Sequence, residues 1–334
     1  MFCWACSDEP VETVFFDLDT QNGVFIACEG NFMYGNSSLS FYNTETEKVI
    51  NQLFYARNNA PLGDVAQSLA LRDNALFIVV NNSGKIYAVD AETTAFKGVI
   101  TGLTSPRYIH FLSDEKAYVS DLYVNHISII NPETYEIKGR IDLGNHTSEQ
   151  VVQIGNRIYI SSWSFDEFLL VIDAETDKLV DSIKVSFQPK ELEIDKNSKI
   201  WILSQGDTEG FSETEVPPAL SRFDPVTQTT EQIYRFEQGE LPAGLEMNSD
   251  RDTVFFINRG VHKMPIDSRN LPDSAFIQPG ELFYSLGVNP HTNEIFVSDA
   301  IDYTQNAMIY RFSQGGRLLD SFRVGINPSD FLFR

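Results

Sequence analysis

The sequence contains few cysteines and no long apolar run. Its three cysteines, Cys3, Cys6 and Cys28, are too few for a disulfide framework. Cys28 follows four apolar residues, and we expect it to be a small buried side chain. No apolar stretch approaches the roughly 18 residues that a membrane-spanning helix requires. The sequence therefore excludes a disulfide scaffold and predicts no membrane helix.

Basic residues are also scarce. The chain has 25 lysines and arginines against 47 acidic residues, which gives a formal net charge of −22. Such a charge repels nucleic acid and anionic membrane surfaces. We therefore expect no nucleic-acid partner. The acidic residues are scattered over turns and strand faces, which is typical of a solvated surface.

Motifs of catalytic sites are missing as well. The five histidines are scattered without the spacing of metal ligands. The sequence has no H-E-x-x-H, glycine-rich phosphate loop or nucleophile elbow. We therefore predict that the protein is not an enzyme, and we assign it no catalytic residue, no metal site and no cofactor.

Aromatic residues and one repeated turn are abundant. The chain has 25 Phe and 13 Tyr, which favour strands. The turn opens with Asp or Asn, whose side chain can accept hydrogen bonds from the backbone that follows. It recurs at intervals of 41 to 51 residues, beginning at Asn43, Asp90, Asn131, Asp173 and Asp224. A repeat of this length indicates a solenoid or a propeller.

Four short strands surround each turn, and six such units follow one another. The clearest has strands at 108–111, 116–120, 126–130 and 136–141. The others are expected at 69–71, 76–80, 85–89 and 96–100; at 151–154, 157–161, 169–172 and 179–183; at 191–194, 200–203, 220–223 and 231–234; at 245–247, 253–257, 261–264 and 275–277; and at 285–288, 295–298, 308–312 and 318–322.

The two ends of the chain supply a seventh unit. Strands at 24–28, 39–42 and 49–53 lack a first strand, and 330–333 is a first strand without the rest. Joining them closes a ring and leaves no long exposed sheet edge. We predict an all-β, seven-bladed β-propeller with four-stranded blades as a single domain over residues 11–334, with residues 1–10 as a tether.

The D-A-E-T and N-P-E-T corners between the third and fourth strands resemble those of YVTN or YncE-like β-propellers. The resemblance covers nearly the whole chain and implies the fold. It implies little about function, because propellers include enzymes, binding proteins and scaffolds.

The connections differ between the two faces of the predicted ring. Those from second to third strands and from fourth to first strands are long and rich in aromatic and amide residues, which is typical of a binding face. The first kind includes 29–36, 121–125, 162–166, 205–218, 258–259 and 299–306, and the second includes 55–66, 105–107, 188–190 and 283–284.

A column of polar residues begins the inner strands at this face. Aligning the apolar positions places Gln67, Arg107, Gln150 and Lys190 side by side, followed by Ala243, Tyr284 and Ser329. The cluster suits a ligand with amides, carboxylate or phosphate. Alternatively, Arg107 and Lys190 form ion pairs with loop acids such as Glu191, which would make them structural.

Four aromatic residues on separate loops are candidates for a rim over a large flat ligand, namely Tyr34, Tyr123, Trp163 and Tyr303. Each could instead anchor its own loop. With Arg259 on a further loop, they complete the predicted ligand-binding set of Gln67, Arg107, Gln150, Lys190 and Tyr284.

Two motifs resemble one group of surface lipoproteins. E-G-N at 29–31 with G-N-x-S-L-S-x-Y at 35–42, and L-G-D-x-A-Q at 62–67, are similar to segments of Bacteroidetes propeller lipoproteins that include the cobalamin-binding BtuG-type proteins. The resemblance implies a cell-surface, outer-membrane protein that captures cobalamin (vitamin B12) or a related corrinoid and delivers it to a TonB-dependent transporter, without chemistry of its own.

The start of the sequence also resembles a lipoprotein. Cys6 follows Ala5 and precedes Ser7-Asp8-Glu9, as a lipidated cysteine would. Only five residues precede Cys6, fewer than a signal peptide needs, so an ordinary terminal cysteine is the alternative.

Two other functions stay open at this stage. A propeller hydrolase or lyase would need a metal ion, for which Glu149, Glu191 and Asp330 are the available ligands. A surface scaffold that binds protein or glycan would lack a saturable pocket for a small ligand.

Overall fold

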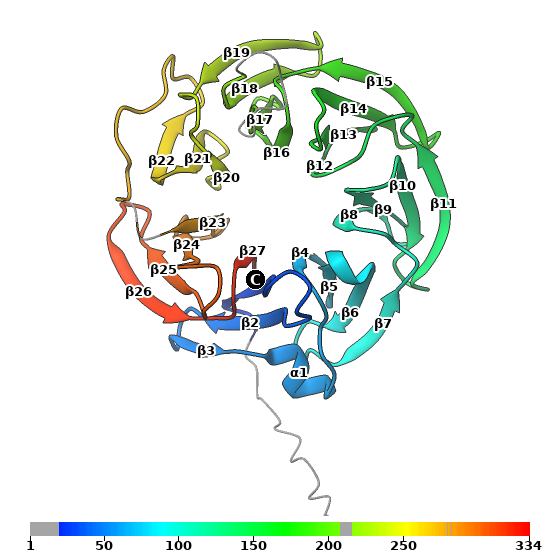
Figure 1. Cartoon of the computed structure of the whole chain (residues 1–334), viewed down its shortest axis with the longest axis vertical. Helices are drawn as coiled ribbons and strands as arrows, with labels where there is room; N and C mark the ends of the chain where they lie inside the picture. The colour runs from blue at the N-terminus through cyan, green and yellow to red at the C-terminus, as the bar shows by residue number, and fades with distance from the viewer. Residues whose placement is uncertain (1–19, 208–215, 279, 281) are drawn as a thin grey trace, which may run out of the picture.

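The structure is a computed structural model that describes residues 20–207, 216–278, 280 and 282–334. The expected tether and the lipidation site Cys6 lie outside these residues. Within them, seven antiparallel sheets are arranged in a ring (Figure 1). The predicted seven-bladed β-propeller is confirmed.

The blades follow one another along the chain, and each begins at the centre of the ring. Blade 1 contains β27 (Pro328–Phe333), β1 (Gly23–Cys28), β2 (Ser38–Asn43) and β3 (Lys48–Ile50); blade 2 contains β4 (Ala66–Arg72), β5 (Ala75–Val80), β6 (Lys85–Asp90) and β7 (Phe96–Ile100); blade 3 contains β8 (Pro106–Ser113), β9 (Lys116–Asp121), β10 (His126–Asn131) and β11 (Glu136–Asp142); blade 4 contains β12 (Val151–Ile154), β13 (Arg157–Ser162), β14 (Phe168–Asp173) and β15 (Lys178–Lys184).

The last three blades complete the ring. Blade 5 contains β16 (Pro189–Ile194), β17 (Ile200–Ser204), β18 (Ala219–Asp224) and β19 (Thr229–Arg235); blade 6 contains β20 (Ala243–Met247), β21 (Thr253–Asn258) and β22 (Gly260–Pro265); blade 7 contains β23 (Phe283–Val288), β24 (Ile295–Asp299), β25 (Met308–Phe312) and β26 (Leu318–Arg323). A short helix, α1 (Leu53–Asn58), and a 3-10 turn, η1 (Asn81–Ser83), lie in connections.

The core is divided among the contacts between blades. Each pair of neighbouring blades encloses one apolar cluster, such as Phe25 and Leu39 of blade 1 against Leu76 and Ile78 of blade 2. Because both faces of a blade are covered, second strands such as β1, β17 and β24 are buried along their whole length. This explains their continuous apolar sequences.

The repeated corners have the geometry that their sequence predicts. The side-chain oxygen of Asn43 accepts hydrogen bonds from the N–H groups of Glu45 and Thr46. Asp90, Asn131 and Asp173 make the equivalent pairs of bonds. These bonds hold the chain where it turns from the third strand of a blade to the fourth.

Two predicted strands differ from the structure. The expected strand at 49–53 ends at Ile50, because Leu53 begins α1 and buries its side chain beside Phe54. In blade 6 the expected strand at 275–277 is only an isolated bridge between Ile277 and Val261. In the described part of the chain, no helix is long and apolar enough to cross a membrane.

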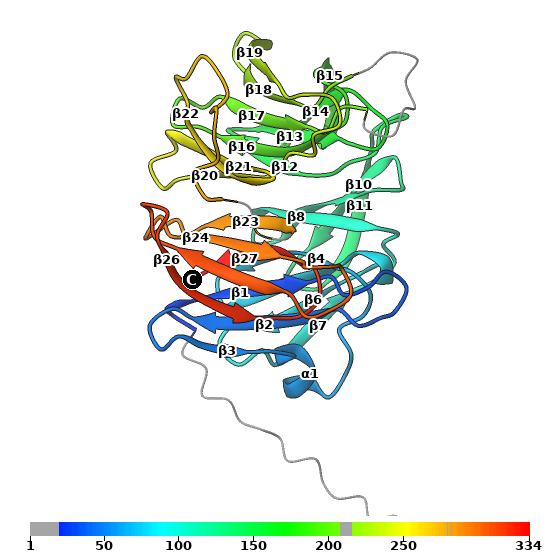
Figure 2. The ribbon, with the colours of Figure 1, turned by 60° about the vertical axis from the view of Figure 1, so that its left-hand side comes forward.

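The two ends of the chain meet in blade 1. β27 pairs antiparallel with β1, with Val24 opposite Phe333 and Ile26 opposite Phe331. Both views of the ribbon show β27 beside β1, which closes the ring (Figures 1 and 2). The predicted closure by the C-terminal strand is confirmed.

Candidate functional site

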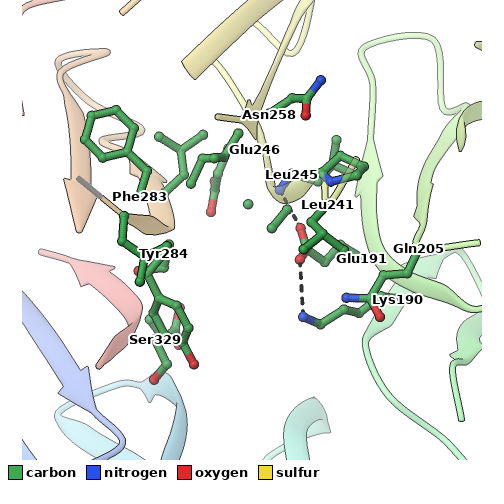
Figure 3. Close-up of a pocket in the computed structure, with 18 of the residues that line it drawn as sticks. Lys190, Glu191, Gln205, Leu241, Leu245, Glu246, Asn258, Phe283, Tyr284 and Ser329 are labelled. Carbon is green, nitrogen blue, oxygen red and sulfur yellow. Dashed lines mark hydrogen bonds and ion pairs between the residues drawn. The ribbon is translucent and has the colours of Figure 1, made fainter. Parts of the chain in front are cut away.

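A cavity of about 570 Å³ lies on the face that carries the long connections. Its lining comes from the beginnings of inner strands and from the ends of second strands with the loops that follow them. Gln205 and Asn258 are examples of the second kind (Figure 3), and so is Glu29. Leu241 and Leu282, from connections between blades, add apolar surface. A concave site of this size and mixed polarity is typical of small-ligand binding.

Six of the ten predicted ligand-binding residues line this cavity, namely Gln67, Gln150, Lys190, Arg259, Tyr284 and Tyr303. The Tyr284 hydroxyl donates a hydrogen bond to the Glu29 carboxylate at 2.7 Å. The Tyr284 ring meets the Tyr303 ring edge-on, with centroids 5.9 Å apart. These contacts hold both tyrosines at the cavity wall.

Arg107 lies behind the wall and is already paired. Its guanidinium donates to both Glu149 carboxylate oxygens, at 2.7 and 2.6 Å, and also to the Gln67 side-chain oxygen. Both Arg107 and Glu149 are buried. Burial disfavours the charge of Arg107, but Glu149 outweighs this effect and raises the pKa of Arg107. Arg107 therefore forms an internal ion pair, with Glu149 in the role that the sequence suggested for Glu191.

Trp163 connects this pair to the cavity. Its indole N–H donates to the Gln205 side-chain oxygen at 2.7 Å. The Arg107 guanidinium carbon and the Lys190 ammonium nitrogen lie 5.8 and 5.5 Å from the centre of its ring. Trp163 thus contacts Gln205 and Lys190 of the cavity wall, and the cations of Lys190 and Arg107 lie in positions suited to cation–π attraction with its ring.

The remaining aromatic candidates lie outside the cavity lining. Tyr34, at the tip of the β1–β2 loop, is 79% exposed, and Tyr123 of the β9–β10 loop is 70% exposed. Of the four predicted rim residues, only Tyr303 lines the cavity directly.

Gln150 lies one position deeper than the sequence alignment placed it. Its side-chain oxygen accepts a hydrogen bond from the Leu192 N–H, just as Glu191 accepts one from Leu245 and Asp330 one from Leu69. Glu149 instead occupies the place beside Arg107. The apolar pattern does not show bulges such as the one that shifts the register at the start of β16.

Carboxyl groups dominate the cavity lining. Glu29, Glu191, Glu240, Glu246 and Asp330 line it, against Lys190 and Arg259 as basic residues. Figure 3 shows the Glu246 side chain directed into the open space. Burial raises the pKa of Glu246 well above its usual value, and nearby Glu193, Asp330 and Glu191 raise it further. Burial also raises the pKa of Glu29, and that of Asp330 to about 6.

The chain was compared with known families and structures. Residues 22–327 match the family model described as a domain of unknown function, DUF5074. The chain belongs to the DUF5074 family. No curated protein matches the chain. The finer resemblance to YVTN-type and cobalamin-binding propellers stays a prediction.

Solved structures share the fold of this DUF5074 chain at low identity. A quinonprotein alcohol dehydrogenase-like protein from Bacteroides thetaiotaomicron is 14% identical, with a TM-score of 0.74, over 94% of this chain and 78% of the other. Hydrazine synthase from Kuenenia stuttgartiensis is also 14% identical, with a TM-score of 0.61, over 79% of this chain and 88% of the other. At such identity the likeness extends to the fold alone.

The sequence analysis missed Glu29 and Glu246 as site residues of this DUF5074 domain. Glu29 was part of a matched motif, and its position directly after β1 places it at the loop face. Glu246 lies two residues after Gly244 on β20, and both line the cavity. Because the consecutive residues Ala243 to Glu246 all line the cavity, strand alternation gives no signal for Glu246.

The three candidate metal ligands are engaged elsewhere. Glu149 binds Arg107, while Glu191 and Asp330 accept backbone hydrogen bonds from neighbouring blades. Over the described residues, no group of three or more His, Cys, Asp and Glu side chains is arranged to hold a metal ion. The metal-dependent alternative thus lacks a ligand set in this part of the chain.

Proposed function

We propose that this protein binds a small polar ligand in the loop-face cavity and performs no chemistry on it. The observation that carries the proposal is the concave lining, in which Gln67, Gln150, Gln205 and Asn258 offer amides beside tyrosine and leucine side chains. Amide groups both donate and accept hydrogen bonds, so they suit a ligand rich in similar groups.

Cobalamin or a related corrinoid is the first candidate ligand. The two motifs that resemble the cobalamin-binding lipoproteins each contribute a lining residue, Glu29 from E-G-N and Gln67 from L-G-D-x-A-Q. A corrin carries many carboxamides, which match the amides and carboxyl groups of the cavity. On this proposal the protein is anchored at the cell surface through Cys6 and passes its ligand to a TonB-dependent outer-membrane transporter.

Isothermal titration with cyanocobalamin tests the proposal. We expect one-to-one binding, weakened at least tenfold in Trp163→Ala, because loss of the indole releases Lys190 and Gln205 from their present positions. A tenfold loss corresponds to about 1.4 kcal/mol. Phe96→Ala is the matched control, since Phe96 is an exposed aromatic residue on β7 and does not line the cavity.

Trp163→Phe separates the two contacts of the indole. It keeps an aromatic ring for Lys190 but loses the N–H that donates to Gln205. Binding intermediate between the native chain and Trp163→Ala would show that both contacts matter. Absence of heat and of thermal stabilisation by cyanocobalamin would refute the corrinoid assignment.

A further inference from the structure

The cavity has an uneven distribution of charge. Among the residues that the structure describes, five carboxyl side chains and two basic ones line it, and Arg107 behind the wall is neutralised by Glu149. Of the two basic residues, Arg259 is exposed on the turn between β21 and β22. The sequence predicted a cationic cluster for carboxylate or phosphate, but the structure leaves only Lys190 in that role.

The positive charge of Lys190 is itself partly compensated by a neighbouring carboxylate. Its ammonium nitrogen lies 3.9 Å from a Glu191 carboxylate oxygen and over the Trp163 ring. An anionic ligand approaching Lys190 would meet the carboxylate of Glu191 at the same place. Since like charges in a partly enclosed site repel strongly, Lys190 is a poor anchor for an anion.

The other carboxyl groups of the lining, those of Glu29, Asp330 and Glu246, have few cationic partners. Glu29 accepts a hydrogen bond from the Tyr284 hydroxyl, and Asp330 accepts hydrogen bonds from the Leu69 and Phe331 N–H groups. For Glu246, the Val288 backbone is a neighbour that lowers its raised pKa. Each of these donors is neutral. Because a carboxyl group has about four acceptor sites, one or two neutral donors leave it able to accept more hydrogen bonds.

We propose that the cavity selects ligands that present N–H donors, as ammonium or carboxamide groups, to Glu29, Glu246 and Asp330, and that it rejects anions. The inference rests on the proposed function, because it assumes that this cavity is the binding site. It deepens that function by naming the ligand chemistry. A corrinoid with neutral carboxamides fits it, and so does a small amine.

Three probes with the same four-carbon skeleton separate the chemistries. Butane-1,4-diamine presents cationic N–H donors, succinamide presents neutral ones, and succinate presents carboxylates. In titration calorimetry and thermal shift assays at pH 8, we expect the diamine and succinamide to bind and succinate not to bind. Succinate affinity equal to that of the diamine would overturn the proposal, as would absence of binding by all three.

A variant and a matched control locate the interaction. We expect Glu246→Gln to weaken diamine binding at least tenfold, because a bound ammonium group stabilises the ionised form of Glu246 and glutamine cannot carry that charge. Succinamide binding should change little, because glutamine keeps an acceptor. Glu237→Gln removes the charge of an exposed residue outside the cavity lining and should leave both affinities unchanged. An unaltered diamine affinity in Glu246→Gln would contradict the proposal.

The pH dependence gives a second readout. Glu246 faces Glu191 and Glu193 of β16 and Asp330 of β27, while Arg251 acts on Glu193. Burial raises the pKa of Asp330 to about 6 and that of Glu193 to about 7, so these groups lose charge as the pH falls from 8 to 5. Diamine affinity should therefore fall over this range, and succinamide affinity should fall less.

Different experimental results would refute the corrinoid assignment and the proposed selection of N–H donors. If cyanocobalamin does not bind but the diamine and succinamide do, the ligand named under the proposed function is wrong and donor selection stands. If cyanocobalamin binds but succinate competes with it and binds as tightly as the diamine, donor selection is wrong and the corrinoid assignment stands.

Discussion

The ion pair between Arg107 and Glu149 joins two neighbouring blades at the cavity wall. Arg107 lies on β8 and Glu149 lies two residues before the first residue of β12, and both are buried. A buried charge without its partner is costly, because the interior does not solvate it as water does. The pair therefore orients the wall only as long as both members are present.

We predict that Glu149→Ala lowers the free energy of unfolding by about 3 to 5 kcal/mol, because it leaves the Arg107 guanidinium buried without its carboxylate. Urea unfolding measures this change. The double variant Arg107→Met, Glu149→Leu should recover most of the loss, since it removes both buried charges. Glu136→Ala, which breaks the exposed pair with Lys138, should have little effect.

A double variant as unstable as Glu149→Ala alone would contradict this account. The instability would then come from lost packing around Glu149 rather than from an unpaired guanidinium.

At the scale of elements, the repeated corner contains a feature that its sequence does not show. The fifth residue of each of the five corners has a positive φ, between 53° and 60°, namely Glu47, Thr94, Tyr135, Asp177 and Gln228. Five different residue types occupy the same left-handed position. The Asx hydrogen bonds and the strand pairing on each side hold the backbone there despite the steric cost of a Cβ atom.

We predict that Glu47→Gly stabilises the protein by about 0.5 to 1 kcal/mol. Relief of the left-handed strain, about 1 to 2 kcal/mol, exceeds the entropy that glycine loses on folding. Urea or thermal unfolding measures the gain, and Glu47→Ala is the control because it removes the same charge and keeps Cβ. Equal stability of the two variants would show that the position carries no strain.

The sequence predicts most strands because their apolar pattern and corners are local. It fails where contacts from elsewhere decide the structure. The predicted strand runs on to Leu53, yet Leu53 begins α1 because the core between blades 1 and 2 takes up Leu53 and Phe54. In blade 6, Ile277 makes only a bridge to Val261.

The candidate site is less predictable than the strands. The loop face follows from connection lengths, and Gln67, Lys190 and Tyr284 follow from the alignment of inner strands. The pairing of Arg107 with Glu149 does not, because the two residues are 42 positions apart and meet only across neighbouring blades. The depth of Gln150 relative to Lys190 is not visible in the sequence, because apolar periodicity does not detect the bulge at the start of β16.

At the scale of the whole molecule, the strand that closes the ring also forms part of the cavity wall. β27 is the inner strand of blade 1, and it supplies Ser329 and Asp330 to the cavity lining. It also covers one edge of β1, whose backbone groups would otherwise be unpaired. An open edge of this kind invites association with other strands. The C-terminal residues therefore contribute to both stability and the site.

We predict that truncation after Asn327 lowers the urea midpoint strongly and promotes aggregation, because it removes the inner strand of blade 1 and exposes the edge of β1. Removal of Arg334 alone is the control. A peptide of residues 328–334 added in trans should restore stability by pairing with β1 as β27 does. The same peptide carrying Asp330→Asn should also restore the fold, but the complex that it forms with the truncated chain should bind butane-1,4-diamine more weakly. An unchanged midpoint after truncation would show that the ring is stable without closure.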